Sequence, residues 1–226
     1  MTRLLIATNN QGKIEELQDL LKDIAVQLVT PADINLDLDV IEDGRTYAEN
    51  ASKKAIAFAQ ASGLISLADD SGLEVDALNG APGLYSARYG SPDGNKLSDS
   101  ERRKYLLGKL KPYPRPWTGR FKATIAVAIP DTVTLKGVKG LALEFSETLR
   151  SLRSLKVTFV EGFCEGEIIS EERGTGGFGY DPIFLFPELG KTMAELSMVV
   201  KNRLSHRAKA VVKANDILKN ILSNAG

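Results

Sequence analysis

Two adjacent carboxylates, Asp69 and Asp70, are the residues of this sequence that point most clearly to chemistry. They follow the apolar run 64–67, which predicts a strand, and they precede Ser71 and a glycine that would turn the chain. Successive side chains of a strand point to opposite faces. We therefore expect Asp69 to support the turn while Asp70 faces a cleft at the carboxyl end of the strand, where open α/β sheets bind ligands. A plain Asp-Asp-Ser-Gly surface turn is the alternative.

A second polar segment joins a predicted strand at 4–7 to a helical pattern at 14–24. It consists of Thr8, Asn9, Asn10, Gln11, Gly12 and Lys13. Free backbone N–H groups and the positive end of the helix dipole favour a phosphate at such a junction, and Lys13 would add a full positive charge. The segment lacks the spacing of a Walker loop, and the alternative is that an asparagine merely caps the helix.

Residues 174–181 combine four glycines with Phe178, Tyr180 and Asp181. Glycines permit close backbone approach to a ligand and aromatic rings can stack on a base, so this segment suits a nucleotide. A tight hairpin whose rings pack inward is the alternative. The only histidine, His206, follows Ser205, which is a suitable N-cap for the last helix. A lone histidine at a helix start is more often structural or exposed than functional.

Any metal in this protein should be a hard cation. One cysteine and one histidine cannot form a transition-metal cluster, whereas carboxylates together with phosphate oxygens suit Mg²⁺. The candidate ligands are Asp69, Asp70, Glu42, Asp43 and Glu49. Lys53 and Lys54 lie on a predicted helix, where one ammonium could reach a phosphate or both could be solvated.

Strands and helices alternate along most of the chain. The patterns predict strands at 4–7, 26–29, 64–68, 121–129 and 157–169, helices at 14–24, 46–62, 98–110 and 205–223, and a short helix near 194–196. This alternation predicts an α/β fold with a mixed sheet. No repeat or linker divides the chain, so residues 1–226 are predicted to form one domain, with an inserted excursion at about 130–156.

The composition bounds the partners. Lysine plus arginine and aspartate plus glutamate both number 29, so no overall positive field favours nucleic acid or a membrane surface. The lone Cys164 excludes an intramolecular disulfide, which agrees with a reducing compartment. The amino terminus is too short for a signal sequence and no apolar run approaches a membrane span. We therefore expect a cytoplasmic protein without a nucleic-acid or membrane partner.

Six segments resemble, in order and spacing, the inosine/xanthosine triphosphate pyrophosphatase family. They are residues 8–13, 49–51, 68–73, 80–89, 174–182 and 205–207. The resemblance runs from residue 4 to about residue 130 and from about residue 157 to the end. It implies a long mixed central sheet flanked by helices, two lobes that enclose a nucleotide cleft, and a homodimer.

The resemblance also implies an activity: hydrolysis of non-standard purine nucleoside triphosphates (ITP, dITP and XTP) to the monophosphate and pyrophosphate, with Mg²⁺. Asp70 would be the catalytic base and a metal ligand, and Lys54 would act beside the phosphates. The substrate would be bound by Thr8, Asn9, Asn10, Gln11, Gly12, Lys13, Ser71, Phe178, Gly179, Tyr180, Asp181, Lys191, His206 and Arg207.

The sequence departs from the family near the expected metal site. Family members usually carry a metal-binding acid three residues before the glycine that aligns with Gly44, and this chain has Ile41 there, so the second ligand would be the adjacent Glu42. Two other functions stay open. One is a pyrophosphatase for standard or pyrimidine triphosphates, and the other, motivated by Ile41, is a nucleotide-binding module without catalysis.

Overall fold

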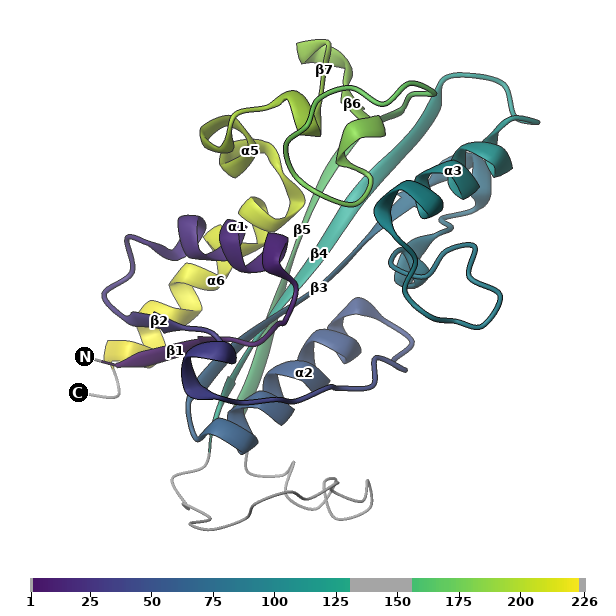
Figure 1. The fold of residues 1–226 in the computed structure, drawn as a ribbon. Coiled ribbons are helices and arrows are strands. Elements are labelled where there is room, and N and C mark those ends of the chain that lie inside the picture. Colours follow the sequence, from purple (N-terminus) through teal and green to yellow (C-terminus); the bar gives the residue numbers. More distant parts are fainter. Residues whose placement is uncertain (1, 131–155, 224–226) are drawn as a thin grey trace.

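The computed structural model describes residues 2–130 and 156–223, which contain one seven-stranded sheet with helices packed around it (Figure 1). In the order in which they lie in the sheet, the strands are β2 (Gln27–Val29), β1 (Arg3–Ile6), β3 (Ile65–Val75), β4 (Trp117–Ile129), β5 (Lys156–Ile168), β6 (Phe184–Phe186) and β7 (Lys191–Thr192). The helices are α1 (Gln11–Leu21), α2 (Tyr47–Ser62), α3 (Asp99–Leu110), α5 (Met198–Leu204) and α6 (His206–Ser223).

The sheet is mixed, as the sequence predicts. β1 runs parallel to β2 and to β3, while β3, β4, β5, β6 and β7 pair antiparallel in turn. Three long strands, β3 to β5, form the spine of the molecule in Figure 1. The α/β class with a long mixed sheet flanked by helices is therefore confirmed.

The expected end of the strand before the acid pair is wrong. β3 continues through Asp69 and Asp70 to Val75, because its whole length pairs with the antiparallel β4, from Ser66↔Ala128 to Val75↔Gly119. Gly72 does not make a turn. A Cβ on Gly72 would lie 2.3 Å from the carbonyl oxygen of Gly83, so this glycine permits a close approach of two backbones.

β1 ends where the acid pair begins, and this difference in length shapes the site. Ile6 pairs with Leu67, and beyond that point the β1-side edge of β3 has, among the described residues, no strand partner apart from an isolated bridge between Glu74 and Pro82. Beside the carboxyl end of β1, the backbone of β3 is therefore open to side chains instead of a neighbouring strand. The acid pair lies at the carboxyl end of β1 rather than at the end of its own strand.

Three apolar clusters pack on the two faces of the sheet. On the face that carries Asp69, α1 and α6 cover Leu67 and Ile125, while α3 and residues 180–193 cover the far end. On the opposite face, α2 covers Ala68 and Ala126. Strand alternation thus directs Asp69 towards α1 and α6 and Asp70 towards the α2 side.

Helix caps follow the sequence signals. Thr46 caps α2 by accepting a hydrogen bond from the Glu49 N–H at 3.1 Å, and Gly63 ends that helix with φ of 67°. The hydroxyl of Ser205 accepts from the Ala208 N–H at 3.2 Å at the start of α6, as expected.

Some elements differ from the predictions. β4 begins at Trp117, four residues before its predicted start at 121, the segment near 194–196 is a 3-10 turn (Met193–Glu195), and α5 has no counterpart in the prediction. The predicted excursion at about 130–156 lies almost entirely outside the described residues. None of the helices in the described part of the chain combines the length and the apolar composition that a membrane span requires.

Candidate active site

Two lysines from different helices meet at the free edge of β3. The Lys13 ammonium approaches from α1 and the Lys54 ammonium from α2, and both donate to the backbone carbonyl of Asp69, at 3.3 Å and 2.7 Å. This carbonyl lies just beyond the end of β1. The lysines therefore converge from two helices at one gap in the sheet edge, which is where an anion would bind.

Asp69 is fully buried on the α1 and α6 face. Its Oδ2 lies 2.7 Å from the Lys13 Nζ and 3.1 Å from an Arg207 nitrogen, and it accepts from the Ser71 hydroxyl at 3.1 Å. Burial alone would raise the pKa of Asp69, but Arg207 and Lys13 outweigh burial and hold the pKa well below its usual range. Asp69 is thus a permanent carboxylate that anchors cations, whereas the sequence predicted that it would support a turn.

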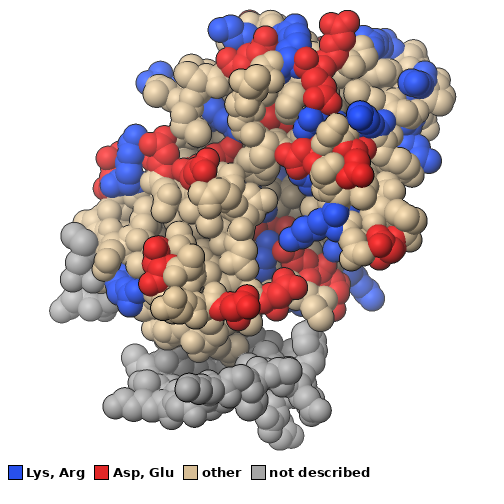
Figure 2. Space-filling view, in the orientation of Figure 1, with Lys and Arg blue, Asp and Glu red and all other residues tan. Residues whose placement is uncertain are grey.

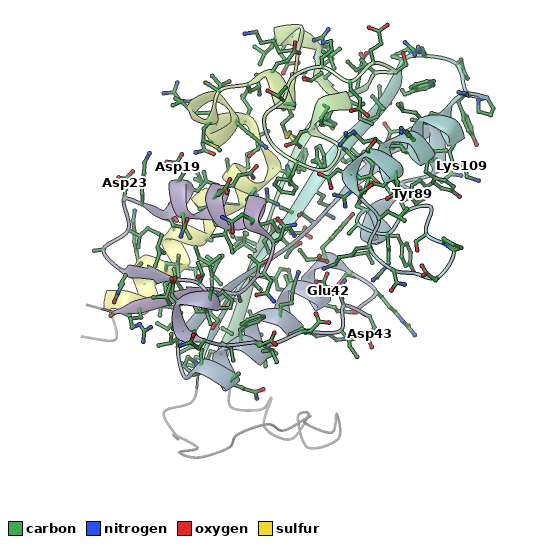
Figure 3. The ribbon with its side chains drawn as sticks, viewed as in Figure 1. Asp19, Asp23, Glu42, Asp43, Tyr89 and Lys109 are labelled. Carbon is green, nitrogen blue, oxygen red and sulfur yellow. The ribbon has the colours of Figure 1, made fainter. Side chains whose placement is uncertain are left out.

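Asp70 has the opposite electrostatic character. It lies on the other face of β3, with its Oδ1 3.5 Å from the Lys54 Nζ, which in turn lies 3.3 Å from Glu42. Burial raises the pKa of Asp70, and Lys54 and Lys13 only partly oppose that shift. The neighbouring Glu42, on the loop before α2 in Figure 3, has a lowered pKa because Lys54 and Lys13 outweigh its burial. Asp70 is therefore a more basic carboxylate than either Asp69 or Glu42.

The loop between β1 and α1 forms a preorganised turn. The Asn10 side chain caps α1 by accepting from the Lys13 N–H at 3.0 Å, while the Thr8 hydroxyl accepts from the Asn10 N–H at 3.2 Å. Asn9 donates to the Leu38 carbonyl at 3.4 Å, and the Gln11 amide donates to Glu15 at 3.0 Å. The capping alternative is therefore present in the structure, and the capping side chain holds the backbone of Lys13 itself.

Gly12 brings this loop against the glycine-rich segment. A Cβ on Gly12 would lie 2.5 Å from Cδ1 of Phe178, so the Phe178 ring packs directly on the start of α1. The Lys201 Nζ and the Arg207 guanidinium each lie 5.6 Å from the centre of that ring. The structure thus joins residues 8–13 and 174–181 into one site.

A buried chain of alternating charges connects the two ends of the site. From Asp69 it continues through Arg207 to Glu16, whose other oxygen lies 2.6 Å from the Lys201 Nζ. Lys201 also lies 2.6 Å from Asp181, whose Oδ2 accepts from the Phe178 N–H at 3.0 Å. Lys13, Asp69, Arg207, Glu16, Lys201 and Asp181 therefore form one unbroken series of ion pairs.

His206 is buried beside this chain. Its ring stacks on Phe121, with the ring centres 4.8 Å apart and the planes 13° apart. Burial, reinforced by the charge of Arg207, lowers the pKa of His206 well below 6.5, so the ring is neutral near pH 7. A neutral ring keeps one donor and one acceptor nitrogen for a ligand.

Unpartnered polar atoms mark where a ligand is expected. Buried side-chain atoms with no hydrogen-bond partner among the described residues include Asp69 Oδ1, Asp70 Oδ2, His206 Nδ1 and Arg207 Nε. Buried polar atoms are nearly always paired in native proteins, so each such atom needs an explanation. These four come from β3 and from the start of α6, so the same site accounts for all of them.

Two sequence-predicted residues lie elsewhere. Tyr180 is 2% exposed and packs in the apolar cluster at the far end of the sheet, where its hydroxyl donates to the Ser86 carbonyl at 2.9 Å. Its ring therefore packs inward, the alternative that the sequence left open. Lys191 is an exposed residue of β7, paired with Phe186 at the far edge of the sheet. It is not brought to the acid pair, because the strands β4, β5 and β6 lie between β3 and β7 in the sheet.

The residues present fit a divalent cation. Asp70 and Glu42 share Lys54, and the buried Asp70 Oδ2 has no partner. No group of three or more histidine, cysteine, aspartate or glutamate side chains forms a metal cage in residues 2–130 and 156–223. The protein therefore supplies few ligands, which suits Mg²⁺, a cation that is usually held by one or two carboxylates and substrate phosphates.

Comparison of the sequence with known proteins finds relatives along nearly the whole chain. The chain matches the Ham1 family over residues 4–217. The chain belongs to the Ham1 family. It is 43% identical over 220 residues to a dITP/XTP pyrophosphatase of Desulforamulus reducens, with 97% of this chain and 96% of the relative covered. It is 42% identical over 210 residues to a dITP/XTP pyrophosphatase of Thermus thermophilus, with 92% of this chain and 88% of the relative covered.

Solved structures of Ham1 proteins share the fold. A HAM1 protein from Coxiella burnetii superposes with a TM-score of 0.76 at 33% identity, covering 97% of this chain and 100% of that chain. The Ham1 protein of Staphylococcus aureus gives a TM-score of 0.70 at 35% identity, with both chains fully covered. The resemblance that the sequence motifs indicated is thereby confirmed.

The structure adds two residues that the sequence analysis missed in this Ham1-family chain. Glu16 and Lys201 are both buried and form the centre of the charge chain. A signal for Glu16 was present, since it lies three residues after Lys13 and so on the same face of α1. Lys201 lies in α5, four residues before Ser205, and the missed helix concealed it.

Proposed function

We propose that this protein hydrolyses ITP, dITP and XTP to the nucleoside monophosphate and pyrophosphate. The single observation that carries the proposal is the convergence of Lys13, Lys54 and Asp70 at the free edge of β3 in a member of the Ham1 family. The dITP/XTP pyrophosphatases named above support the substrate class. The enzyme is a hydrolase that acts on an anhydride bond of a triphosphate.

The end of the site near Lys13, Lys54 and Asp70 binds the triphosphate and activates the attacking water. Lys13 and the loop at residues 8–12 bind the triphosphate, and Lys54 neutralises charge on the departing pyrophosphate. Asp70 orients a water molecule and accepts its proton as the water attacks the α-phosphorus. Its raised pKa suits that role, because a more basic carboxylate holds the proton better. Ser71 lies next to Asp70 and donates to Asp69, so it completes the wall on the other face.

Charge balance supports Mg²⁺ as the cofactor. Four cations at the site (Lys13, Lys54, Lys201 and Arg207) face five carboxylates (Asp69, Asp70, Glu42, Glu16 and Asp181). A site without surplus positive charge needs a triphosphate that arrives with its own cation. Asp70 and Glu42 would hold the metal, which when bound supplies charge neutralisation for the leaving phosphates.

The base end reads the purine. Phe178 would pack against the base, with Gly179 and Asp181 shaping its backbone, while His206 and Arg207 present the unpaired Nδ1 and Nε to a 6-oxo group. The Arg207 Nε always carries a hydrogen and can donate, because the guanidinium is always charged. The His206 Nδ1 can donate only in the tautomer that carries its proton there. Adenine carries an amino donor at that position, which would leave buried donors unpaired, and such a mismatch can cost orders of magnitude in rate.

The decisive experiment measures Mg²⁺-dependent pyrophosphate release from ITP by the wild type and by Asp70→Asn. We expect the wild type to release pyrophosphate and the nucleoside monophosphate. The substitution should lower kcat by about 10²–10⁴-fold, the usual contribution of a general base. ITP binding without turnover by the wild type would instead indicate a binding module. Preferred turnover of dTTP or GTP would indicate a pyrophosphatase for standard or pyrimidine triphosphates.

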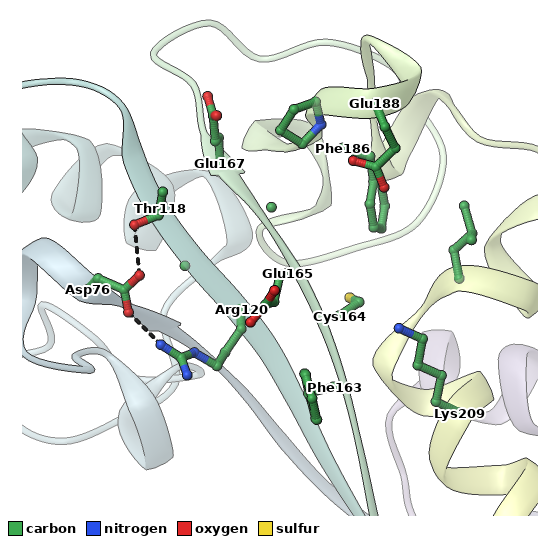
Figure 4. Close-up of a pocket in the computed structure, with 14 residues that line it drawn as sticks. Asp76, Thr118, Arg120, Phe163, Cys164, Glu165, Glu167, Phe186, Glu188 and Lys209 are labelled. Atoms are coloured by element: carbon green, nitrogen blue, oxygen red, sulfur yellow. Dashed lines mark hydrogen bonds and ion pairs between the residues drawn. The ribbon is translucent and has the colours of Figure 1, made fainter.

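We also propose a homodimer that works in the cytoplasm, where nucleoside triphosphates are used. Phe159 and Phe163 project from β5 with 50% and 53% of their surface exposed, and Val212 of α6 is 64% exposed. Phe163 lines two adjoining cavities of about 610 and 500 Å³, the larger of which is drawn in Figure 4. Exposed apolar side chains in such a groove fit a second copy of the chain. Charges of both signs are interspersed over the face in Figure 2, which gives no single-sign patch for nucleic acid.

Phe163→Asp tests the dimer. We expect the molar mass in solution to fall to that of the monomer, because a charge would be buried in the interface. Light scattering after size exclusion gives the mass. Tyr113→Asp is the matched control, since Tyr113 is also exposed (43%) but lies away from the two cavities. A Phe163→Asp variant that keeps the wild-type mass would contradict this placement of the interface.

A further inference from the structure

One residue of the glycine-rich segment, Gly179, is held by α3 at both its backbone N–H and its backbone carbonyl. The Gly179 N–H donates to the Asp99 carboxylate at 2.5 Å, and the Gly179 carbonyl accepts from the Arg103 guanidinium at 2.7 Å. Gly179 is buried and has a φ of +66°, so its backbone lies in the left-handed region that glycine tolerates.

Arg103 reaches a second point of the same segment. Its other terminal nitrogen donates to Glu172 at 2.8 Å, so one guanidinium links the beginning of the segment to its tip. Asp99 is paired with Arg102, whose guanidinium lies 5.6 Å from the centre of the Tyr180 ring. A planar guanidinium with two fixed directions of donation suits such a two-point link better than a single ammonium would.

The first turn of α3 is itself fixed. Ser98 and Glu101 form a capping box, in which the Ser98 hydroxyl accepts from the Glu101 N–H at 3.3 Å and Glu101 accepts from the Ser98 N–H at 3.0 Å. Further along the helix, Leu106 and Leu110 are buried in the apolar cluster at the far end of the sheet. Asp99 and Arg103 therefore project from a rigid support.

Gly179 follows Phe178 directly and lies two residues before Asp181. Phe178 packs on Gly12, and Asp181 pairs with Lys201, so both neighbours belong to the candidate site. The four glycines of 174–179 give this backbone many accessible conformations. Contacts that fix Gly179 consequently fix where the Phe178 ring and the Asp181 carboxylate lie, although α3 itself does not line the site.

We infer that Asp99 and Arg103 of α3 are positioning residues for base recognition: they hold the backbone of Gly179 so that Phe178 and Asp181 can contact the purine. The inference rests on the proposed function, because it assigns the glycine-rich segment to the base. It predicts an effect on the base end of the substrate alone. Within residues 2–130 and 156–223, the side-chain hydrogen bonds and ion pairs of Asp99 and Arg103 go to Gly179, Glu172 and Arg102, and none goes to α1, α2 or β3.

The test compares Arg103→Ala with the wild type. We expect KM for ITP to rise about tenfold, the loss expected for one charge-assisted hydrogen bond, with kcat nearly unchanged and the preference for ITP over ATP reduced by a similar factor. Inhibition by inorganic tripolyphosphate, which occupies only the phosphate end, should keep its wild-type constant. Arg103→Lys should restore part of the preference, since it retains one donor for Gly179.

Lys104→Ala is the matched control, because Lys104 is an exposed neighbour on the same helix. If Arg103→Ala fails to fold, Asp99→Asn, which keeps the shape of the side chain, carries the same test. An unchanged KM and preference in folded variants would overturn the inference, as would an equal loss of tripolyphosphate binding. Failure of the wild type to release pyrophosphate from ITP would overturn the proposed function instead, so the two failures are distinguishable.

Discussion

Lys13 and Lys201 are both largely buried lysines of the same site, yet the protein treats their charges in opposite ways. Burial lowers the pKa of Lys13, and although Asp69 opposes the shift, Lys54 and Arg207 add to it. Burial also acts to lower the pKa of Lys201, but Asp181 and Glu16 outweigh it and raise the pKa. The phosphate end thus holds a cation that lacks sufficient negative charge, whereas the base end holds one that is fully satisfied.

This difference separates two tasks. A charge that the folded protein disfavours is relieved when an anion arrives, so Lys13 is suited to bind phosphate. A charge already satisfied by two carboxylates gains little from a ligand, so Lys201 is suited to hold the backbone around it.

The largest expected effect comes from breaking the satisfied end. Glu16→Gln removes the carboxylate that lies between Arg207 and Lys201, so each buried cation loses one of its two carboxylate partners. Breaking a buried ion pair typically costs about 3–5 kcal/mol. Denaturant unfolding should show that loss in the free energy of unfolding. Glu15→Gln, at an exposed neighbour on α1, should change the free energy very little. A loss below about 1 kcal/mol for Glu16→Gln would remove the contrast between the two ends.

The unsatisfied end should respond more in binding than in stability. Lys13→Ala should raise KM for ITP by about 100-fold, which equals about 2.7 kcal/mol. Its loss of stability should be smaller than that of Glu16→Gln, because the folded state disfavours the Lys13 charge and Asp69 keeps Arg207 as its partner. Binding of the nucleoside inosine should change far less than binding of ITP. Lys22→Ala, at the other end of α1, serves as the control. Equal losses for nucleoside and triphosphate would contradict a phosphate role.

The smallest expected effect sharpens the contrast at His206. Its folded pKa is lowered, so below 6.5 the unfolded state binds more protons than the folded state, and stability falls as the pH drops. The slope approaches about 1.4 kcal/mol per pH unit for a single group. His206→Gln should flatten the free energy of unfolding between about pH 5 and 6.5 relative to the wild type. An identical slope in both proteins would show that His206 titrates normally.

The local parts of the site could be predicted from the sequence. The cap of α1 by Asn10, the start of α2 at Thr46 and the buried position of Asp69 all follow from short patterns, since each depends on residues a few positions apart. The α/β class with a mixed sheet also follows from the alternation of strands and helices. Short patterns suffice for the two caps because each capping side chain contacts the backbone three residues away.

The pairing of distant charges could not be predicted in the same way. The ion pair of Glu16 with Arg207 joins residues 191 positions apart, and no periodicity records such a contact. The family resemblance assigns base recognition to Lys191, whereas the lysine that the structure brings beside Asp181 is Lys201, in the missed helix α5. Likewise, the length of β3 could not be read from its own residues. The strand continues through the polar Asp69 and Asp70 because its backbone hydrogen-bonds to β4 along its whole length.

The carbonyl oxygen of Asp69 has a consequence for how tightly a substrate can be held. Both ammonium groups, Lys13 and Lys54, already donate to this one main-chain oxygen. An incoming phosphate must share or take over these donors, so the protein's own backbone acts as a resident competitor. Part of the attraction is thereby cancelled in advance, and after the reaction the same oxygen can reclaim the lysines as pyrophosphate departs.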